Sequence, residues 1–337
     1  MSKSLLITGG AGFIASHFIH YIRQQYPEYH IINIDKLTYA GSDTNLKHIT
    51  FTENYDFIKG DIADEQLINH IFSDYDIDGV IHFAAESHVD RSIKDAKTFI
   101  ESNVLGTTVL LQAARNAWNK AGELDKRRFY QISTDEVYGS LELDTDKRFN
   151  EQTPYDPRNP YSASKASADM LVKSFGHTYD MNIVTSSSSN NYGPGQHAEK
   201  LIPTIISNAL HGKPIPLYGD GKNVRDWLYV KDHCRALDLV FHEGKTLEKY
   251  NISGRNEQSN IELALMICDI LDHLKPKTYS HKELITFTDD RQGHDRRYAV
   301  DDRKIRTTLG WKPLMTFDAG LNKTVEWYVD QWEKVTL

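Results

Sequence analysis

The chain has 337 residues, 39 % of them hydrophobic and 26 % charged, a composition typical of globular proteins with a large core. Its net charge of −8 argues against surfaces that bind nucleic acid or anionic membranes. Cys234 and Cys268 provide no disulfide framework, and the sequence shows no metal-ligand cluster, signal-peptide pattern or apolar run of membrane-spanning length. We therefore expect a cytoplasmic enzyme with no metal site that binds neither nucleic acid nor membrane.

The N-terminal segment predicts a strand, a glycine-rich turn and a helix. Residues 4–8 are mostly apolar, Gly9-Gly-Ala-Gly12 interrupts them, and residues 13–23 carry apolar side chains at helical spacing. A dinucleotide fingerprint requires this order, because the glycines let the backbone approach a pyrophosphate at the helix N-terminus. Ala15 stands at the third fingerprint position, where Gly is usual, and adds one methyl group.

Acidic residues follow the next two predicted strands. Residues 30–34 form a strand that ends at Asp35, whose carboxylate would hydrogen-bond the adenosine ribose and repel a 2′-phosphate, which favours NAD over NADP. A simple turn Asp is the alternative, and the adjacent Lys36 would tolerate a phosphate. Residues 55–60 predict a third strand, and Asp61 after it is placed to meet an adenine amino group.

The alternation of strands and helices predicts the fold class. We expect a fourth strand at residues 79–85, a long helix at 96–121, a fifth strand at 128–132 and a sixth at 182–186. Apolar strands separated by helices indicate a parallel sheet covered on both faces. The prediction is an α/β fold: a Rossmann-type doubly wound parallel sheet with a smaller, mixed α/β C-terminal substrate domain.

The fifth strand leads into Ser133-Thr-Asp-Glu-Val-Tyr-Gly139, which places a hydroxyl and two adjacent carboxylates where ligands bind in an open α/β sheet. A polar turn in which a carboxylate caps the next element is the alternative. Tyr161-Ser-Ala-Ser-Lys165 then opens a helix that we expect to reach about His177. Tyr161 and Lys165 lie one turn apart on one helix face, and a nearby ammonium would lower the pKa of the phenol and make it a base.

The strand–helix rhythm weakens after the sixth strand. Ser186-Ser-Ser-Ser-Asn-Asn-Tyr-Gly-Pro194 resembles a shaped active-site turn, with low complexity as the alternative. Further elements are expected at 200–211, 232–243, 257–274 and 316–333 (helices) and at 216–218 and 284–288 (strands). We assign residues 1–189, with a returning segment at about 226–253, to an NAD-binding domain, and residues 190–225 and 254–337 to a nucleotide-sugar-binding domain.

A cationic segment lies in the second domain. Asp290-Arg-Gln-Gly-His-Asp-Arg-Arg297 is rich in arginine for an acidic protein. Because Arg suits bidentate phosphate binding, this segment and Arg225 suggest a diphosphate pocket. A solvated charged loop is the alternative.

A series of motifs resembles the extended short-chain dehydrogenase/reductase family, and within it the dTDP-glucose 4,6-dehydratases most closely. The resemblance covers nearly the whole chain. Its markers are Asp35-Lys-Leu-Thr-Tyr-Ala-Gly41, Ala84-Ala-Glu-Ser-His-Val-Asp-Arg-Ser92, Ser133–Gly139, Tyr161–Lys165, Glu199-Lys-Leu-Ile-Pro203, Arg225-Asp-Trp-Leu-Tyr-Val230 and Gly293-His-Asp-Arg-Arg-Tyr298. The Asp135–Glu136 pair is the discriminating marker, because sugar-nucleotide epimerases of the same fold lack it.

The resemblance implies a reaction in which tightly held NAD is regenerated in each turnover. Tyr161, assisted by Lys165, removes the proton of the glucose 4-hydroxyl as hydride leaves C4. Glu136 takes the C5 proton, and protonated Asp135 donates to the departing 6-hydroxyl. Hydride then returns to C6 while Glu136 reprotonates C5, and Thr134 hydrogen-bonds the 4-hydroxyl. Two carboxyls of unequal pKa beside one bond suit such an elimination.

The resemblance also implies the binding residues. NAD would contact Gly9, Gly12, Phe13, Ile14, Asp35, Lys36, Leu37, Thr38, Asp61, Ile62, Phe83, Ala84, Ala85, Ser102, Tyr161, Lys165 and Asn191. The nucleotide sugar would contact Ser87, Thr134, Asn190, Glu199, Lys200, Leu201, Pro216, Leu217, Tyr218, Arg225, Asn260, Asp290, Arg291, Gln292, Gly293 and His294. Family members pair through long helices, so we also expect a homodimer.

The chain departs from the family pattern near these sugar contacts. Gly195, His197 and Ala198 replace the usual Tyr, Phe and Pro, and Gln292 replaces a Pro. A UDP-sugar 4,6-dehydratase or a UDP-sugar 4-epimerase therefore stays open beside the dTDP-glucose enzyme. A catalytically dead NAD-sensing regulator is a third hypothesis, but it has no need of the Tyr–Lys and Asp–Glu pairs together.

Overall fold

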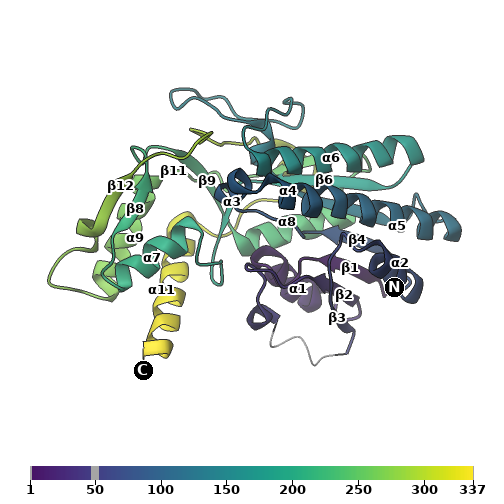
Figure 1. Cartoon of the computed structure of the whole chain (residues 1–337), viewed down its shortest axis with the longest axis horizontal. Coiled ribbons are helices and arrows are strands. Elements are labelled where there is room, and N and C mark those ends of the chain that lie inside the picture. The colour runs from purple at the N-terminus through teal and green to yellow at the C-terminus, as the bar shows by residue number, and fades with distance from the viewer. Residues whose placement is uncertain (1, 47–52, 337) are drawn as a thin grey trace.

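The structure is a computed structural model that describes residues 2–46 and 53–336. At its centre lies a seven-stranded parallel sheet with the order β10-β6-β5-β4-β1-β2-β3 (Figure 1). The strands are β1 (Ser4–Thr8), β2 (His30–Asp35), β3 (Tyr55–Lys59), β4 (Gly79–His82), β5 (Arg128–Thr134), β6 (Ile183–Ser188) and β10 (Lys249–Ile252). The strand order reverses between β1 and β4, which creates a ligand-binding crevice at their carboxyl ends. The expected doubly wound α/β class is confirmed.

Alternate side chains of each strand enter two hydrophobic layers. Leu5 and Ile7 share a core with α1 (Phe13–Gln25) and α8 (Val230–Glu243). Leu6 instead packs into the layer formed by α2 (Glu65–Asp74), α5 (Gly106–Ala121) and α6 (Pro160–Tyr179). Because both faces of the sheet are covered, the strands are apolar almost throughout.

The long helix expected at 96–121 is present but is not uniform. It consists of α4 (Ala96–Phe99), a π-helical turn at Ile100–Leu105 and α5. A Cβ at Gly106 would lie 2.6 Å from Cδ1 of Ile62, so only glycine lets the helix pass this close to the loop after β3. π-Helical turns are frequent at functional sites, and this one carries Ser102.

A second hydrophobic core occupies the C-terminal part of the molecule, at the left of Figure 1. Its helices are α7 (Leu201–Leu210), α9 (Asn260–Leu274) and α11 (Phe317–Thr336). Its strands are β7 (Asn190–Tyr192), β9 (Val224–Tyr229) and β11 (Glu257–Ser259), in the order β11-β9-β7, and the parallel pair β8 (Ile215–Tyr218) and β12 (Ile285–Thr288). Trp227 and Tyr229 enter this core, whereas Leu228 between them enters the α1/α8 core.

The remaining elements are short. They are η1 (Asp43–Leu46), α3 (Val89–Lys94), η3 (Asp135–Tyr138), η4 (His281–Leu284) and α10 (Arg303–Leu309). Within the described ranges, no helix combines the length and apolar character needed to cross a membrane.

Several predicted boundaries are wrong for identifiable reasons. The helix expected at 257–274 begins only at Asn260, because Ser259 and Glu262 form a capping box and residues 257–259 pair with β9. β9 was not predicted as a strand, since Arg225 and Asp226 interrupt its hydrophobic pattern yet are both buried. Hydrophobic periodicity cannot predict a strand whose buried positions are occupied by charged residues.

Candidate active site

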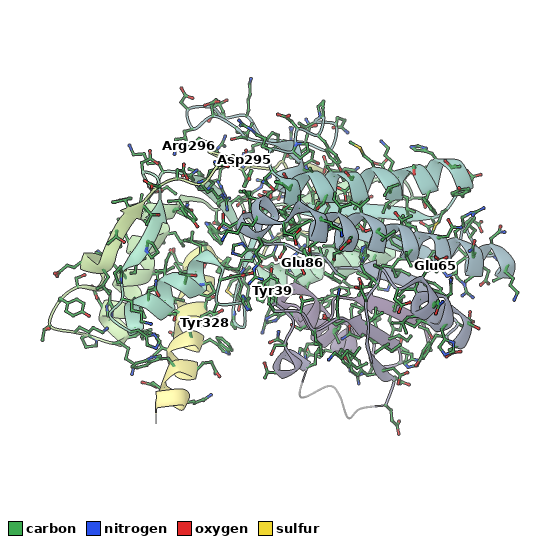
Figure 2. All side chains as sticks on the ribbon, viewed as in Figure 1. Tyr39, Glu65, Glu86, Asp295, Arg296 and Tyr328 are labelled. Atoms are coloured by element: carbon green, nitrogen blue, oxygen red, sulfur yellow. The ribbon has the colours of Figure 1, made fainter. Side chains whose placement is uncertain are left out.

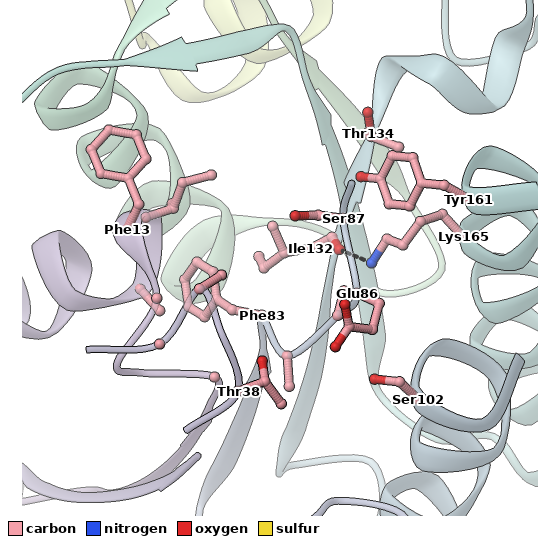
Figure 3. Close-up of a pocket in the computed structure, with 18 of the residues that line it drawn as sticks. Phe13, Thr38, Phe83, Glu86, Ser87, Ser102, Ile132, Thr134, Tyr161 and Lys165 are labelled. Carbon is pink, nitrogen blue, oxygen red and sulfur yellow. Dashed lines mark hydrogen bonds between the residues drawn. The ribbon is translucent and has the colours of Figure 1, made fainter. Parts of the chain in front are cut away.

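A cavity of about 520 Å³ extends along the carboxyl ends of β1, β2, β4 and β5. Figure 3 shows Phe13, Thr38 and Phe83 toward one end of it and Thr134, Tyr161 and Lys165 toward the other. Every residue assigned to NAD lines this cavity except Leu37, whose backbone N–H instead donates to Asp35 Oδ1 at 2.7 Å.

The glycine turn at the β1 end is shaped for close approach. Gly9 has φ +71°, and a Cβ there would lie 2.7 Å from Cα of Ala84. Gly12 precedes α1 and has no side chain to cap the first N–H groups of the helix. A helix N-terminus open to a cavity suits a pyrophosphate, so these residues fit the dinucleotide that the fold implies. Ala15 is buried in the first helical turn and still lines the cavity.

Asp35 is held by the turn that it faces. Its Oδ2 accepts the backbone N–H of Ala11 at 2.9 Å, and it lies at the end of β2 with 9 % of its surface exposed. The neighbouring Lys36 donates to Oδ2 of Asp61 at 2.6 Å. Burial raises the pKa of Asp61, but the hydrogen bonds from Lys36 and the Ala63 N–H outweigh burial and hold the pKa below its usual value. Lys36 therefore neutralises a carboxylate of this chain, which weakens the case for a phosphate partner.

Tyr161 and Lys165 occupy the first two turns of α6. Asn159 and Ser162 form a capping box and Pro160 stands at the first helical position, so this helix begins at a defined residue. Both side chains are at least nine-tenths buried and point toward the end of β5 (Figure 3).

The expectation that Lys165 lowers the pKa of Tyr161 is wrong for this structure. Burial, and next the carboxylate of Glu136, raise the pKa of Tyr161, although a hydrogen bond with Thr134 opposes them. The ammonium of Lys165 donates to the carbonyl of Ile132 at 2.8 Å (Figure 3). The pair shares a helix face as predicted, but the cation is engaged with the backbone of β5.

Asp135 and Glu136 lie in the 3₁₀ turn after β5, and both line the cavity. Oδ2 of Asp135 and Oε2 of Glu136 are buried and have no hydrogen-bond partner. Unpartnered buried carboxyl oxygens are costly, and they mark these groups as available to a ligand.

The surroundings of the two carboxyls differ in charge. Burial, then Glu136 and Asp226, raise the pKa of Asp135 well above its ordinary value, and Arg225 only partly opposes them. Burial also raises the pKa of Glu136, but Arg291, Arg225 and Lys200 all oppose that rise. The pKa of both carboxyls is thus raised, that of Asp135 well above its ordinary value, and the three cations make Glu136 the one that ionises more readily.

The residues assigned to the sugar nucleotide fall into two groups. Ser87, Thr134, Asn190, Glu199 and Lys200 line the cavity. The remaining ones lie outside its lining: Leu201, Pro216, Leu217, Tyr218, Arg225, Asn260, Asp290, Arg291, Gln292, Gly293 and His294.

Two members of the second group, Arg225 and Arg291, nevertheless lower the pKa of Glu136 by their positive charge. Arg225 donates to the carbonyls of Val224 and Asp295 and lies over the ring of Tyr298 at 4.2 Å. Arg291 has a buried Nε without a partner and, like Arg225, lowers the pKa of Glu136. The side chain of Leu217 is buried in the second core and is unavailable to a ligand.

Sequence reasoning missed an acidic and aromatic cluster at the mouth of the cavity. Glu86, directly after β4, lines the cavity and hydrogen-bonds Tyr39, and both lie between the two parts of the molecule (Figure 2). Arg91 lies over the ring of Tyr39 at 3.5 Å, and its Nε is 3.6 Å from Glu199. The end of β4 was the available signal, since polar residues that follow a parallel strand face the crevice.

The other lining residues that were not predicted are mostly small. They are Ala15, Ile34, Ala40, Gly41, Gly60, Ala63, Thr98, Glu101, Leu105, Ile132, Ser133, Ser188, Ser189, Gln196 and His197. Across residues 2–46 and 53–336, no group of three or more His, Cys, Asp and Glu is arranged to hold a metal ion.

The chain matches the family model described as GDP-mannose 4,6 dehydratase over residues 6–324. It is 51 % identical to dTDP-glucose 4,6-dehydratase of Salmonella typhimurium, covering 97 % of this chain and 94 % of that protein. The Haemophilus influenzae enzyme of the same name is 48 % identical, with 97 % and 98 % covered.

Solved structures agree with these relatives. The dTDP-glucose 4,6-dehydratase of Streptomyces venezuelae, solved with NAD, has a TM-score of 0.90 and 41 % identity over 98 % of each chain. The Thermotoga maritima UDP-glucose 4-epimerase has a TM-score of 0.85 but 27 % identity, over 98 % of this chain and 100 % of that one. The chain therefore belongs to the GDP-mannose 4,6-dehydratase family and, within it, to the dTDP-glucose 4,6-dehydratases.

Proposed function

We propose that the protein is an NAD-dependent hydro-lyase that converts dTDP-glucose to dTDP-4-keto-6-deoxyglucose and water. The observation that carries this proposal is the pair of carboxyls of Asp135 and Glu136, each with one buried oxygen that has no partner, beside Tyr161 in a cavity lined by the glycine turn. Elimination across C5–C6 needs one acid and one base at the same bond. Burial raises the pKa of both carboxyls, and Glu136 has more cations around it than Asp135 has.

NAD, when bound, supplies the hydride acceptor for C4 and the hydride donor for C6. The glycine turn, Asp35 and the Thr38 loop would hold its adenosine and pyrophosphate, while Ser102 and Asn191 line the deeper part of the cavity.

The protein residues move the protons. Tyr161 removes the proton of the 4-hydroxyl, which Thr134 orients through its own hydroxyl. The resulting 4-ketone acidifies C5–H, and Glu136 takes that proton. Asp135 gives its proton to the 6-hydroxyl, which leaves as water, and Glu136 returns its proton to C5. Glu136 is reset by these steps, whereas the proton that Tyr161 has gained replaces the one that Asp135 has lost before the next turnover.

Tyr161 is neutral in this structure because its pKa is raised. It acts as a base only when cations lie close enough to stabilise its phenolate. Lys165, four residues along the same helix, and the oxidised nicotinamide ring are the cations suited to this task.

A UDP-sugar 4-epimerase is the second candidate because epimerases share the fold. An epimerase leaves the 6-hydroxyl in place and does not need a protonated carboxyl beside it, so Asp135 favours the dehydratase. The choice of nucleotide and sugar has less support than the dehydration, because the chain departs from the family pattern near the sugar contacts. Gly195 stands where the family's usual residue is Tyr, and its φ of +82° is a conformation that Tyr would adopt only with strain.

We further propose that the α1/α8 and α2/α5/α6 layers form the NAD-binding domain, residues 1–189 with 226–253, and that the second core forms the nucleotide-sugar domain. A homodimer is supported by the exposed side chains of Ile93, Ile100 and Met170, which lie on α3, the π-helical turn and α6. A cytoplasmic location is supported by Cys234 and Cys268, both buried free thiols.

Mass spectrometry of the products from dTDP-glucose and UDP-glucose tests the proposal. We expect a product lighter by one water, with an alkali-induced 4-keto-6-deoxy chromophore, formed faster from dTDP-glucose. An epimerised sugar that keeps its 6-hydroxyl would refute the dehydratase in favour of the epimerase. Faster dehydration of UDP-glucose would reassign the nucleotide, and turnover of neither would leave the regulator hypothesis.

A further inference from the structure

A buried charged network behind the catalytic strand end has no part in the proton transfers described above. Asp169 lies on α6 four residues after Lys165 and eight after Tyr161, so the three side chains follow one face of the helix. Asp169 is 4 % exposed and Lys165 is 4 % exposed. Buried charges are stable only when an opposite charge compensates them.

Asp169 is held as an acceptor from three directions. Its carboxylate accepts Ser133 Oγ at 2.6 Å, the Tyr155 hydroxyl at 2.9 Å and Gln131 Nε2 at 3.4 Å. The Ser133 contact ties it directly to the residue before Thr134. The three donors therefore fix the position of this carboxylate.

A second buried ammonium fixes the direction of this network. Lys249 on β10 donates to the Tyr155 oxygen at 2.7 Å and lies 4.0 Å from Asp169. Because an ammonium can only donate, the hydroxyl hydrogen of Tyr155 must point to Asp169. The rings of Tyr138 and Tyr155 lie 4.2 Å and 4.3 Å from the same ammonium. Burial lowers the pKa of Lys249 to about 8, and Asp169 is the first charge that opposes this shift.

Lys165 has fewer partners. Tyr161 and Asp169 share its face of α6, the Ile132 carbonyl of β5 accepts from its ammonium, and its charge acts on the imidazole of His82 on β4. Burial lowers the pKa of His82 to about 3, so that ring is neutral. Burial also lowers the pKa of Lys165, and Asp169 is the charge that opposes it.

We propose that Asp169 is a positioning residue whose fixed negative charge keeps Lys165 protonated inside the fold, and that Tyr155 and Lys249 hold this carboxylate in place from the far side. Lys165 then carries its charge before any ligand binds, and Tyr161 has a cation within its own helix to stabilise a phenolate. This role of Asp169 depends on the proposed dehydratase function in one readout only, the rate of hydride transfer.

The first test measures thermal unfolding against pH in the Lys249→Met background, where Lys165 is the remaining ammonium beside Asp169. Adding Asp169→Asn leaves Lys165 without its counter-ion and lowers its folded pKa further. The unfolded state then binds more protons than the folded state, so stability rises with pH. We expect the stability lost through Asp169→Asn to shrink as the pH rises toward about 10.4, the ordinary pKa of Lys. A loss that is constant with pH would show a packing role and overturn the proposal.

Ser133→Ala is the matched control, because it removes one hydrogen bond to Asp169 and keeps the charge. Its stability loss must not change with pH. Should Asp169→Asn fail to fold, Lys165→Met combined with Asp169→Asn in the same Lys249→Met background is the decisive variant. We expect removal of the ammonium to restore folding, and a double variant that stays unfolded would refute the counter-ion role.

The second readout is single-turnover formation of the reduced cofactor from dTDP-glucose. We expect the alkaline limb of its pH profile to move down by about one unit in Asp169→Asn and to return in Asp169→Glu. An unmoved limb overturns the proposal. Absence of cofactor reduction in the unmodified protein would instead refute the proposed function, while the stability tests stay valid.

Discussion

The ammonium of Lys36 lies 2.6 Å from the carboxylate of Asp61, so the strand ends of β2 and β3 are joined by an ion pair. This pair removes the cation that would otherwise attract the 2′-phosphate of NADP. Asp35 remains beside the glycine turn, held by the Ala11 N–H. Together the two contacts explain why a basic residue directly after Asp35 is compatible with NAD.

Asp61→Asn should narrow the preference for NAD over NADP by about tenfold, the equivalent of one charge-assisted hydrogen bond. The substitution releases Lys36 to meet a phosphate. Dissociation constants of both cofactors, measured with the protein stripped of nucleotide, test this expectation. Asp64→Asn is the control, because Asp64 caps α2 through its Oδ1 and Asn can do the same. An unchanged NAD/NADP ratio in Asp61→Asn would contradict the role of the ion pair.

Glu136→Gln should still reduce the cofactor with dTDP-glucose but should lose water at least about 100-fold more slowly, because the amide cannot accept the C5 proton. Rapid mixing followed by mass spectrometry separates reduced-cofactor formation from water loss. Glu142→Gln, on an exposed side chain in the following loop, serves as the control. Normal elimination in Glu136→Gln would reject its assignment as the base.

Gly9→Ala should cost more stability than Gly122→Ala, although both glycines have φ near +70°. At Gly122 an added Cβ meets nothing within 4 Å, so only backbone strain of about 1 kcal/mol is expected. At Gly9 the Cβ would also collide with the backbone of Ala84. Thermal unfolding of the two variants isolates the collision, and equal losses would mean that the turn relaxes freely.

His82 should make the protein sensitive to acid. The Thr107 hydroxyl donates to the Asn103 carbonyl, so its oxygen accepts from Nε2 of His82. In a neutral ring Nδ1 is then an acceptor, so the Thr8 hydroxyl donates to it while accepting the Ala84 N–H. The neutral ring with hydrogen on Nε2 satisfies both contacts. Burial lowers the pKa of His82 from 6.5 to about 3.

The folded pKa of His82 is depressed, so its contribution to stability is fully present above about pH 6.5 and is lost as the pH falls toward about 3, on the order of 5 kcal/mol. His82→Gln keeps an acceptor and a donor but cannot be protonated, so its unfolding free energy should fall less steeply over this window. Urea unfolding at several pH values measures the difference. His70→Gln changes an exposed residue of α2 and should leave the slope of the unfolding free energy against pH unchanged. If the unfolding free energy of His82→Gln fell as steeply as that of the unmodified protein, this account would be contradicted.

The parts of the site that could be predicted from sequence are those where short spacing determines geometry. The glycine turn before α1, Asp35 at a strand end, and Tyr161 and Lys165 on one helix face each depend on a few neighbouring residues. Asp135 and Glu136 were placed correctly for the same reason, since they directly follow β5.

The parts that could not be predicted depend on contacts between distant segments. Asp169 meets Lys249, 80 positions away in the sequence, and the pairing has no local pattern. The direction of the Tyr161 pKa shift was also predicted wrongly, because the pKa is raised and not lowered. Helical spacing does not reveal that the Lys165 ammonium donates to the Ile132 carbonyl or that the Glu136 carboxylate lies near the phenol. Strand β9 was missed because its buried Arg225 and Asp226 look like surface residues.

The alternating side chains of β9 join two otherwise separate hydrophobic interiors. A strand whose even and odd residues belong to different cores cannot leave one without disturbing the other. The segment that carries Arg225, which acts on both catalytic carboxyls, is therefore also a mechanical link. Local unfolding of the second core would therefore also disturb the α1/α8 core, which lies under the glycine turn. We expect the molecule to unfold in a single cooperative transition.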